Sequence, residues 1–409
     1  MRTARFALPL VLTLASAGAL ADDSYFCRQL DIPGSSKTQA WQINNLGQVA
    51  ATGDGDIGFI YSAGAWQAMP TPPPDSGFTS AEVHAYGLND FGMVGGGASA
   101  TGATFTGFIL FNGDYHFFSS PLPGSSYAEV EGLNNSGIAT VQSFVYNPSR
   151  NVPSLSVALV YNPGGLPPYQ QGFTEIDPPE LDDGTAPDYT KPGQMNSSGT
   201  FVGNARYPNR HGFFGFIHDP QSGATNSFRV GGFPTWAPGI NNHGDIVGAV
   251  RPGYDFGKFE GFLRTAQGDA IFHCAGVDAA GGLFPKSIND NGLISGAVFD
   301  VPPGIDITAL ISGSLLDVHS GVHGFIGYPS VAAALADLRG AIDEAAPDES
   351  AQVQEAESAY AGGNIAGACG RLEAVVSQLT AQSGQTVQAQ VATSLTAEAQ
   401  SIIGAACPR

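Results

Sequence analysis

The segment Leu88-Asn89-Asp90-Phe91-Gly92 contains a five-residue motif: an apolar residue, Asn, two variable residues and Gly. The motif occurs six times in the 409 residues. Its asparagines are Asn44, Asn89, Asn134, Asn196, Asn241 and Asn289, separated by 45, 45, 62, 45 and 48 residues. Asn starts turns because its side chain hydrogen-bonds the backbone two residues on, and Gly accepts the positive φ of a hairpin with a bulge. Each motif therefore predicts a turn that leads into a strand.

Short apolar runs follow the motifs in a regular order. One run begins directly after the Gly, as in 48–50 and 93–95, and a second contains Gly-Phe-Ile or Gly-Phe-Leu in most units. A last run closes most units, as in 115–118 and 270–273. A period near 45 residues with four short strands is typical of propeller blades. We predict a mainly β protein with a six-bladed β-propeller over residues 22–328, because a closed ring buries each blade between two neighbours.

Composition agrees with this fold class and limits the partners. The chain has 55 Gly and 28 Pro, the two residue types that cost most in a helix, yet 43% of its residues are hydrophobic. It carries 16 Lys and Arg against 36 Asp and Glu, a net charge of −20. Nucleic-acid binding needs clustered basic side chains, so we expect no nucleic-acid partner.

The N-terminus has the features of a secretory signal peptide. Arg2 and Arg5 precede an apolar run over 6–14, and Ala19-Leu20-Ala21 matches a cleavage site. We predict cleavage after Ala21 and a secreted, periplasmic or cell-surface protein. The apolar run is too short to span a membrane, and no later apolar stretch is long enough.

Four cysteines, an even number in an exported chain, predict two disulfides with three possible connectivities. Cys27 and Cys274 begin similar segments, Cys-x-x-Leu-Asp and Cys-x-x-Val-Asp, at equivalent positions of the first and sixth units. A closed ring makes those units neighbours. We therefore predict a Cys27–Cys274 disulfide, with the N-terminal strand completing the last blade, and a second disulfide between Cys369 and Cys407.

Residues 329–409 have a different character. Phe and Trp are absent, and apolar residues recur at helical spacing, as in Val331, Leu335, Leu338 and Ile342. Gly362-Gly363-Asn364 indicates the end of one helix and the N-cap of the next. We predict a small bundle of three or four helices in which Cys369–Cys407 joins two of them.

Two parts of the chain resemble known bacterial families. The Ile-Asn-x-x-Gly motif followed by Gly-Phe-Ile/Leu resembles the HAF-type extracellular repeats of bacterial secreted proteins, over roughly residues 24–328. That resemblance implies a β-propeller-like fold and export, and no defined reaction. Residues 366–407 resemble the helical FIMAH module at the C-termini of bacterial extracellular proteins, which implies an accessory or adhesion role without catalytic residues.

Familiar catalytic motifs do not occur. The sequence has no Gly-x-Ser-x-Gly, His-Glu-x-x-His, Cys-x-x-Cys or phosphate-loop motif. Residues 53–58 satisfy Gly-x-Gly-x-x-Gly, but they lie between two predicted strands with no helix to receive a pyrophosphate, so we interpret them as a hairpin loop. Asp54 and Asp56 in this loop are weak candidates for Ca²⁺ ligands, although no complete ligand loop is present. No other cofactor is expected.

The strands just before the motifs carry the candidate binding residues. In a propeller these strands lie near the central channel, and two aligned columns can be read from them. One column holds Trp41, Tyr86, Glu131, Gly193, Pro238 and Lys286, and the other holds Gln39, His84, Glu129, Lys191, Trp236 and Phe284. Structural positions of a repeat should be alike, whereas these differ. We predict a ligand pocket at the channel mouth formed by Trp41, His84, Tyr86, Glu129, Glu131, Lys191, Trp236 and Lys286. The alternative is that they are loop-edge residues that vary freely.

Three functions fit these observations. We expect a binding or cell-surface interaction protein without catalysis, whose partner is an extracellular glycan or an envelope protein. Aromatic rings beside carboxylates suit a carbohydrate. The second hypothesis is a secreted polysaccharide-degrading enzyme, a lyase or hydrolase, with Glu129 or Glu131 and His84 as acid and base. The third is a purely structural cell-surface protein.

Overall fold

The computed structural model describes residues 24–78, 82–100, 104–147, 152–208, 212–252, 258–275, 277, 282–300 and 321–407. The predicted signal peptide, residues 1–21, lies outside the described residues. Strands occupy the chain up to Tyr328 and helices follow from Val331, so the protein is mainly β with a C-terminal helical segment.

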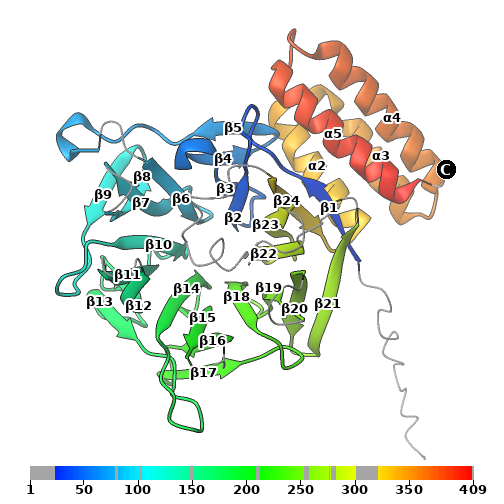
Figure 1. Ribbon diagram of the computed structural model, residues 1–409. Helices are drawn as coiled ribbons and strands as arrows, with labels where there is room; N and C mark the ends of the chain where they lie inside the picture. The colour runs from blue at the N-terminus through cyan, green and yellow to red at the C-terminus, as the bar shows by residue number, and fades with distance from the viewer. Residues whose placement is uncertain are drawn as a thin grey trace, which may run out of the picture.

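The strands form sheets that surround a central axis in a propeller-like arrangement (Figure 1). Four of the sheets have four antiparallel strands each, in sequence order from the axis outward. The first contains β2 (Gln39–Ile43), β3 (Val49–Thr52), β4 (Gly58–Ser62) and β5 (Ala65–Ala68). The second contains β6 (Glu82–Leu88), β7 (Val94–Ser99), β8 (Thr106–Phe111) and β9 (Asp114–Phe118). The third contains β10 (Ala128–Leu133), β11 (Ala139–Asn147), β12 (Val152–Asn162) and β13 (Gly172–Ile176). The fourth contains β14 (Tyr189–Met195), β15 (Phe201–Tyr207), β16 (Gly212–Asp219) and β17 (Ala224–Phe228).

The fifth sheet has eight strands, so the prediction of six separate blades is not matched. Its order is β18-β19-β20-β21-β1-β24-β23-β22. These strands are β18 (Thr235–Ile240), β19 (Ile246–Val250), β20 (Glu260–Thr265), β21 (Gly268–Ala275), β22 (Gly282–Ile288), β23 (Ile294–Phe299), β24 (Val322–Tyr328) and β1 (Ser24–Gln29). The cause is β1, which pairs antiparallel with β24 on one side and parallel with β21 on the other. The N-terminal strand therefore completes the last unit, as predicted, and also joins it to the unit before.

The Cys27–Cys274 disulfide fixes this junction and confirms the predicted pairing. Tyr25 is the register partner of Cys274, so the bridge links two adjacent parallel strands. Cys274 lies on β21, which pairs with β20 and belongs to the fifth repeat unit. Cys27 lies on β1, which flanks β24 as β21 flanks β20, so the two cysteines occupy equivalent positions in neighbouring units of the ring, as predicted.

The motif asparagines form a closed ring of hydrogen bonds. The side-chain amide of each Asn donates to the backbone carbonyl of the motif Asn in the next unit, at 2.9–3.3 Å, and Asn289 closes the ring by donating to Asn44. Each Asn Oδ1 also accepts from the backbone amides two and four residues on, as Asn89 does from Phe91 (3.0 Å) and Met93 (2.9 Å). The predicted turn is confirmed, and the same side chain also couples neighbouring units.

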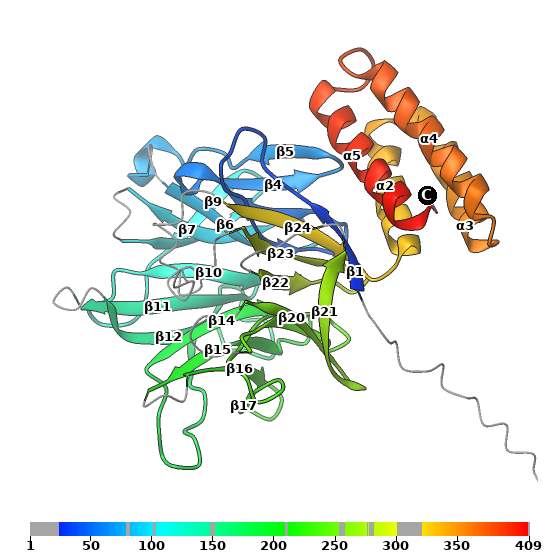
Figure 2. The same ribbon diagram turned by 45° about the vertical axis from the view of Figure 1, so that its right-hand side comes forward.

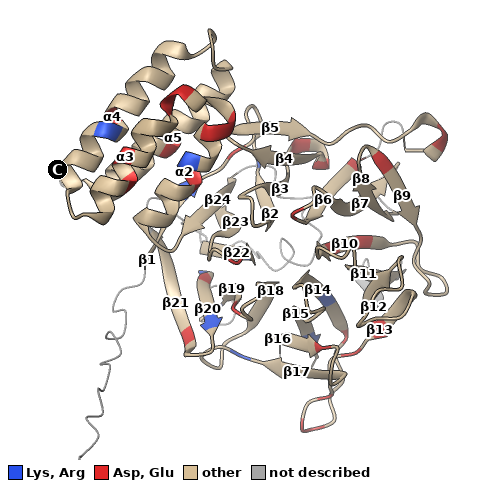
Figure 3. Ribbon diagram, turned by 180° about the vertical axis from the view of Figure 1, so that it is seen from behind, with Lys and Arg blue, Asp and Glu red and all other residues tan. Residues whose placement is uncertain are grey.

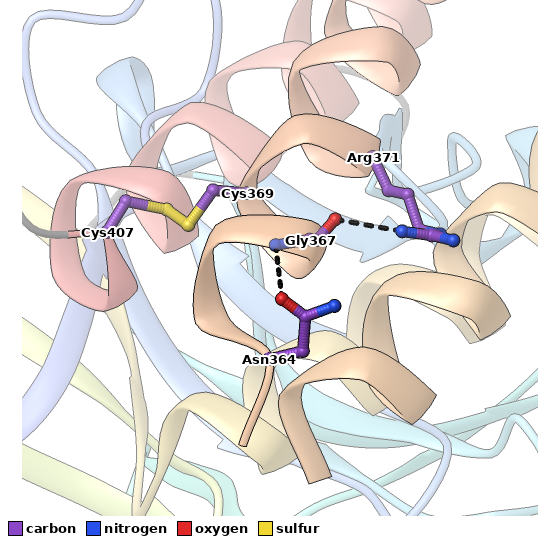
Figure 4. Close-up of a disulfide and its surroundings, with 5 residues drawn as sticks. All are labelled: Asn364, Gly367, Cys369, Arg371 and Cys407. Atoms are coloured by element: carbon purple, nitrogen blue, oxygen red, sulfur yellow. Dashed lines mark hydrogen bonds between the residues drawn. A yellow bond between two sulfur atoms is a disulfide. The ribbon is translucent and has the colours of Figure 1, made fainter. Parts of the chain in front are cut away.

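The four C-terminal helices are α2 (Val331–Ala345), α3 (Ser350–Ala361), α4 (Ile365–Gln382) and α5 (Ala389–Ala406). Asn364 caps α4 by accepting a hydrogen bond from the amide of Gly367, as predicted from the Gly-Gly-Asn sequence (Figure 4). Cys369 on α4 pairs with Cys407 after α5, which confirms the second disulfide. Within the described residues, none of these helices combines the length and apolar character needed to cross a bilayer.

The helices pack beside β1, β24 and the first sheet (Figures 1 and 2). Their apolar residues, including Leu335, Leu338 and Leu395, share one buried cluster with Tyr61 and Tyr328 of the strands. Buried Arg28 on β1 forms an ion pair with Glu398 on α5 at 3.1 Å. The helical segment is therefore anchored at the place where the ring is joined by its N-terminal strand.

We predict that Asn89→Asp destabilises the fold by about 2–3 kcal/mol. Asn89 is 2% exposed, and the change removes the amide that donates to Asn134 and places a carboxylate against that carbonyl oxygen. Denaturant unfolding measures the cost. Asn226→Asp, the same change at an exposed position on β17, is the control. Equal unfolding midpoints for the two variants would contradict a stabilising role of the ring.

Candidate functional site

A bulge occurs at the same place in all six innermost strands. In β2, Ala40 pairs with Ala51 and Ile43 with Val49, so two residues oppose one on β3. Equivalent register shifts interrupt β6, β10, β14, β18 and β22. The first predicted column falls within these bulges: Trp41, Tyr86, Glu131, Gly193, Pro238 and Lys286. A bulge re-aims side chains and strengthens local twist, which explains why this column is distinct.

Glycines on the second strand make the close approach at the bulge possible. A Cβ on Gly96 would lie 1.8 Å from the carbonyl oxygen of His84, and a Cβ on Gly248 would lie 1.9 Å from that of Trp236. No other residue fits at such distances. Gly203 and Gly296 make the same approach in the fourth and sixth units, so in four of the units a glycine admits the bulged inner strand, while Ala51 and Val141 stand at this position in the first and third.

Two glutamine side chains form hydrogen bonds across the channel to the inner strands of other units. Gln42 of the first unit donates to the carbonyl of Leu133 at 3.1 Å and accepts from its amide at 3.2 Å. Gln194 of the fourth unit accepts from the amide of Ile240 (3.1 Å) and the hydroxyl of Ser287 (3.0 Å). The cavity enclosed by the motif turns measures only about 40 Å³. A cavity of this size has room for ordered water molecules among the polar groups of the turns.

The predicted columns converge on one polar cluster in the second, third and fourth units. His84 Nδ1 lies 2.6 Å from Glu129 Oε1 and 2.9 Å from the Tyr86 hydroxyl. Tyr127, which the sequence columns missed, donates its hydroxyl to Glu129 Oε2. His84, Tyr86 and Glu129 are buried on inner strands, and Tyr127, in the segment that leads into β10, is partly exposed.

A second set of contacts joins the fourth unit to the third and the sixth unit to the first. Lys191 Nζ lies 2.9 Å from Glu131 Oε1 in a buried ion pair. Lys286 Nζ lies 3.0 Å from the ring centroid of Trp41 and 3.2 Å from Gln39 Oε1. The rings of Trp41 and Tyr86 are 4.3 Å apart. Trp41 and Lys286 are partly exposed, so a ligand would reach these two first.

Burial and the neighbouring charged groups shift the pKa values of three side chains in the cluster. Burial and the neighbouring Lys191 cation lower the pKa of Lys286 well below its usual value. Burial raises the pKa of Glu131, an effect that Lys191 partly offsets. For His84, burial opposes the charged form, but the adjacent Glu129 carboxylate outweighs it and raises the pKa. Lys and Arg residues are sparse on the ring (Figure 3), which makes two lysines in one cluster, Lys191 buried and Lys286 partly exposed, unusual for this chain.

Trp236 does not join the polar cluster. It is 2% exposed and packs among Phe213, Phe259 and Phe284 in an aromatic core. Gly193 and Pro238 supply no reactive group to the channel, and a Cβ on Gly193 would lie 2.4 Å from the carbonyl oxygen of Pro238. Of the column residues that the structure describes, those of the fifth unit, Trp236 and Pro238, therefore add no polar contact to the cluster.

Asp54 and Asp56, the calcium candidates, contact different partners. Both carboxylate oxygens of Asp54 accept hydrogen bonds from Ser36, at 2.6 and 2.9 Å. Asp56 Oδ1 pairs with Lys37 Nζ at 2.7 Å. The two side chains are thus engaged separately within the 3₁₀ turn η1 (Asp54–Asp56).

The sequence matches no protein-family model and no curated protein. Among solved structures the chain is similar to U3-55K, with 10% identity and a TM-score of 0.39 over 74% of this chain and 98% of that one. It is also similar to a mutant of AofleA from Arthrobotrys oligospora, with 9% identity and a TM-score of 0.38 over 67% and 83%. A third is the Aleuria aurantia lectin with α-methyl-L-fucoside, with 10% identity and a TM-score of 0.33 over 59% and 79%. At these low scores, no residue role follows from the likenesses.

We predict that Lys191→Met costs about 3–5 kcal/mol of stability, because it leaves the Glu131 carboxylate buried without its cation. Adding Glu131→Gln should recover much of that cost, which a double-mutant cycle in denaturant measures. Arg206→Met is the control, since the Arg206–Asp188 pair is 44% and 43% exposed and should contribute only about 0–1 kcal/mol. Additive effects of the Lys191 and Glu131 changes would contradict the buried pair.

Proposed function

We propose that this chain is an exported propeller protein that binds carbohydrate in the channel at the cluster around Trp41, Tyr86 and Glu131. In this proposal the eight-stranded sheet counts as two blades joined by β1, which makes six. The two disulfides support export, since such bridges persist in oxidising compartments. The predicted signal peptide and the resemblance to HAF repeats and to the FIMAH module favour the same compartment. Residues 329–409 would then be an attachment module.

The observation that carries the proposal is the convergence of aromatic and charged side chains from several repeat units. Trp41 and Tyr86 offer ring faces, while Glu131, Lys191 and Lys286 offer hydrogen-bonding groups beside them. Aromatic surface with a few placed polar groups is the usual composition of small-molecule sites. A sugar matches it because one face of its ring is apolar and its rim carries hydroxyl groups.

Binding to a glycan array, followed by affinity measurement on the best glycan, tests this function. We expect Trp41→Ala to weaken binding at least about tenfold, which corresponds to ~1.4 kcal/mol. Trp66→Ala is the matched control, because Trp66 lies in the same unit on the outer strand β5. Absence of binding to any glycan or envelope fraction, or equal losses in both variants, would contradict the proposal.

A second candidate function is polysaccharide cleavage by a lyase or hydrolase. The observation that favours it is the position of Lys286 beside Trp41 and the cation of Lys191, where burial and that cation lower its pKa and so favour the uncharged amine that a general base needs. His84 and Glu131 would be the other participants. We expect any breakdown of a polysaccharide to fall at least about a hundredfold in Lys286→Met, the size typical of a lost general base. Activity that survives Lys286→Met, Glu131→Gln and His84→Ala would place the reaction elsewhere.

A further inference from the structure

Asp56, Glu82 and His84 come from two neighbouring repeat units and meet at the edge of the candidate site. One ligand atom from each, a carboxylate oxygen or a ring nitrogen, lies within 4.8 Å of the other two. The backbone fixes this approach, because Ile57 forms a parallel bridge with Val83. Gly58 allows the strands to come this close, since a Cβ there would lie 2.8 Å from the carbonyl oxygen of Val83.

The hydrogen bonds leave one nitrogen of His84 available. Glu129 accepts from Tyr127 at Oε2, and its Oε1 lies 2.6 Å from His84 Nδ1. A carboxylate only accepts hydrogen bonds, so this network assigns the proton of a neutral imidazole to Nδ1. Nε2 then carries the lone pair. It is buried in a side chain that is 8% exposed and has no hydrogen-bond partner among the described residues.

The carboxylates of Glu82 and Asp56 each have an oxygen atom that could bind a further ligand. Glu82 Oε2 is buried and has no hydrogen-bond partner within the described part of the chain. Lys37 pairs with Asp56 Oδ1 at 2.7 Å, which leaves Oδ2 of the same carboxylate as a further oxygen. Two carboxylates thus face one lysine, so the group holds an excess of negative charge.

We propose that Asp56, Glu82 and His84 bind a divalent first-row transition metal ion such as Zn²⁺, with His84 Nε2 as the nitrogen ligand. One imidazole and two carboxylates suit such ions, whereas Ca²⁺ and Mg²⁺ prefer oxygen ligands alone. Metal-binding histidines usually donate their other N–H to a carboxylate that fixes the ring, and Glu129 occupies that position. Three protein ligands leave a coordination position for water or substrate.

The site differs from the calcium candidate in the sequence. It uses Asp56 without Asp54, whose oxygens are held by Ser36, and it adds two residues from the next unit. Neither residue is close to Asp56 in the sequence, and the packing of the second sheet against the first brings the three together. The inference is independent of carbohydrate binding.

Isothermal titration of the full exported chain with Zn²⁺, after removal of bound metal by a chelator, tests the site without any carbohydrate. We expect one Zn²⁺ per chain, and at least about tenfold weaker binding in Glu82→Gln and in Asp56→Asn. Asp54→Asn is the control, since it makes the same change two residues away and should keep the wild-type affinity. No stoichiometric binding, or an equal loss in Asp54→Asn, would overturn the proposal.

Two further measurements address His84 directly. Glu129→Gln leaves all three ligands in place and should weaken Zn²⁺ binding about 10–100-fold by loosening the ring. Unchanged affinity would overturn the assigned role of Glu129. In the wild-type chain loaded with Co²⁺, one histidine N–H proton should show a large paramagnetic NMR shift. Absence of such a proton would overturn ligation by His84 even if the variants fail to fold.

Discussion

The ring of asparagine hydrogen bonds is the constraint on which the rest of the molecule depends. Each motif Asn satisfies two amides of its own turn and then donates to the turn of the next unit. Because the donor and acceptor belong to different units, the bond forms only when the units are arranged around a common axis. The same bond therefore specifies local turn shape and global closure, and the glutamine hydrogen bonds and bulged strands are positioned relative to it.

The sequence predicted the fold through periodicity, and it predicted the site only in outline. A motif that repeats near every 45 residues fixes the strand order, and Asn364 and the four cysteines locate helix ends and bridges. The cysteines of β1 and β21 predicted that these strands lie side by side, but nothing in their residues indicated that they pair and so join two units into one sheet.

The sequence predicted some residues of the candidate site correctly and missed or misplaced others. Column alignment found His84, Glu129, Glu131, Lys191 and Lys286, because variation within a regular repeat is visible in the sequence. It also included Trp236, which packs in an aromatic core, since side-chain direction at a bulge cannot be read from spacing. Tyr127 was missed because it precedes its strand, and Glu82 because it begins one. The glycines that face the bulges, such as Gly96, are the signal that would have marked the inward column.

The position of β1 has a consequence for the order of assembly. This strand is made before every other element of the ring, yet both of its partners, β21 and β24, are made near the end of the strand region. Its pairing joins the two ends of the strand region, so loop-closure entropy delays it until the intervening units have formed. Until then the edges of β21 and β24 are open to other strands, including β1 of a second copy. Oxidation of Cys27 with Cys274 would make whichever closure comes first permanent, so the timing of disulfide formation decides between a monomeric ring and an exchanged pair.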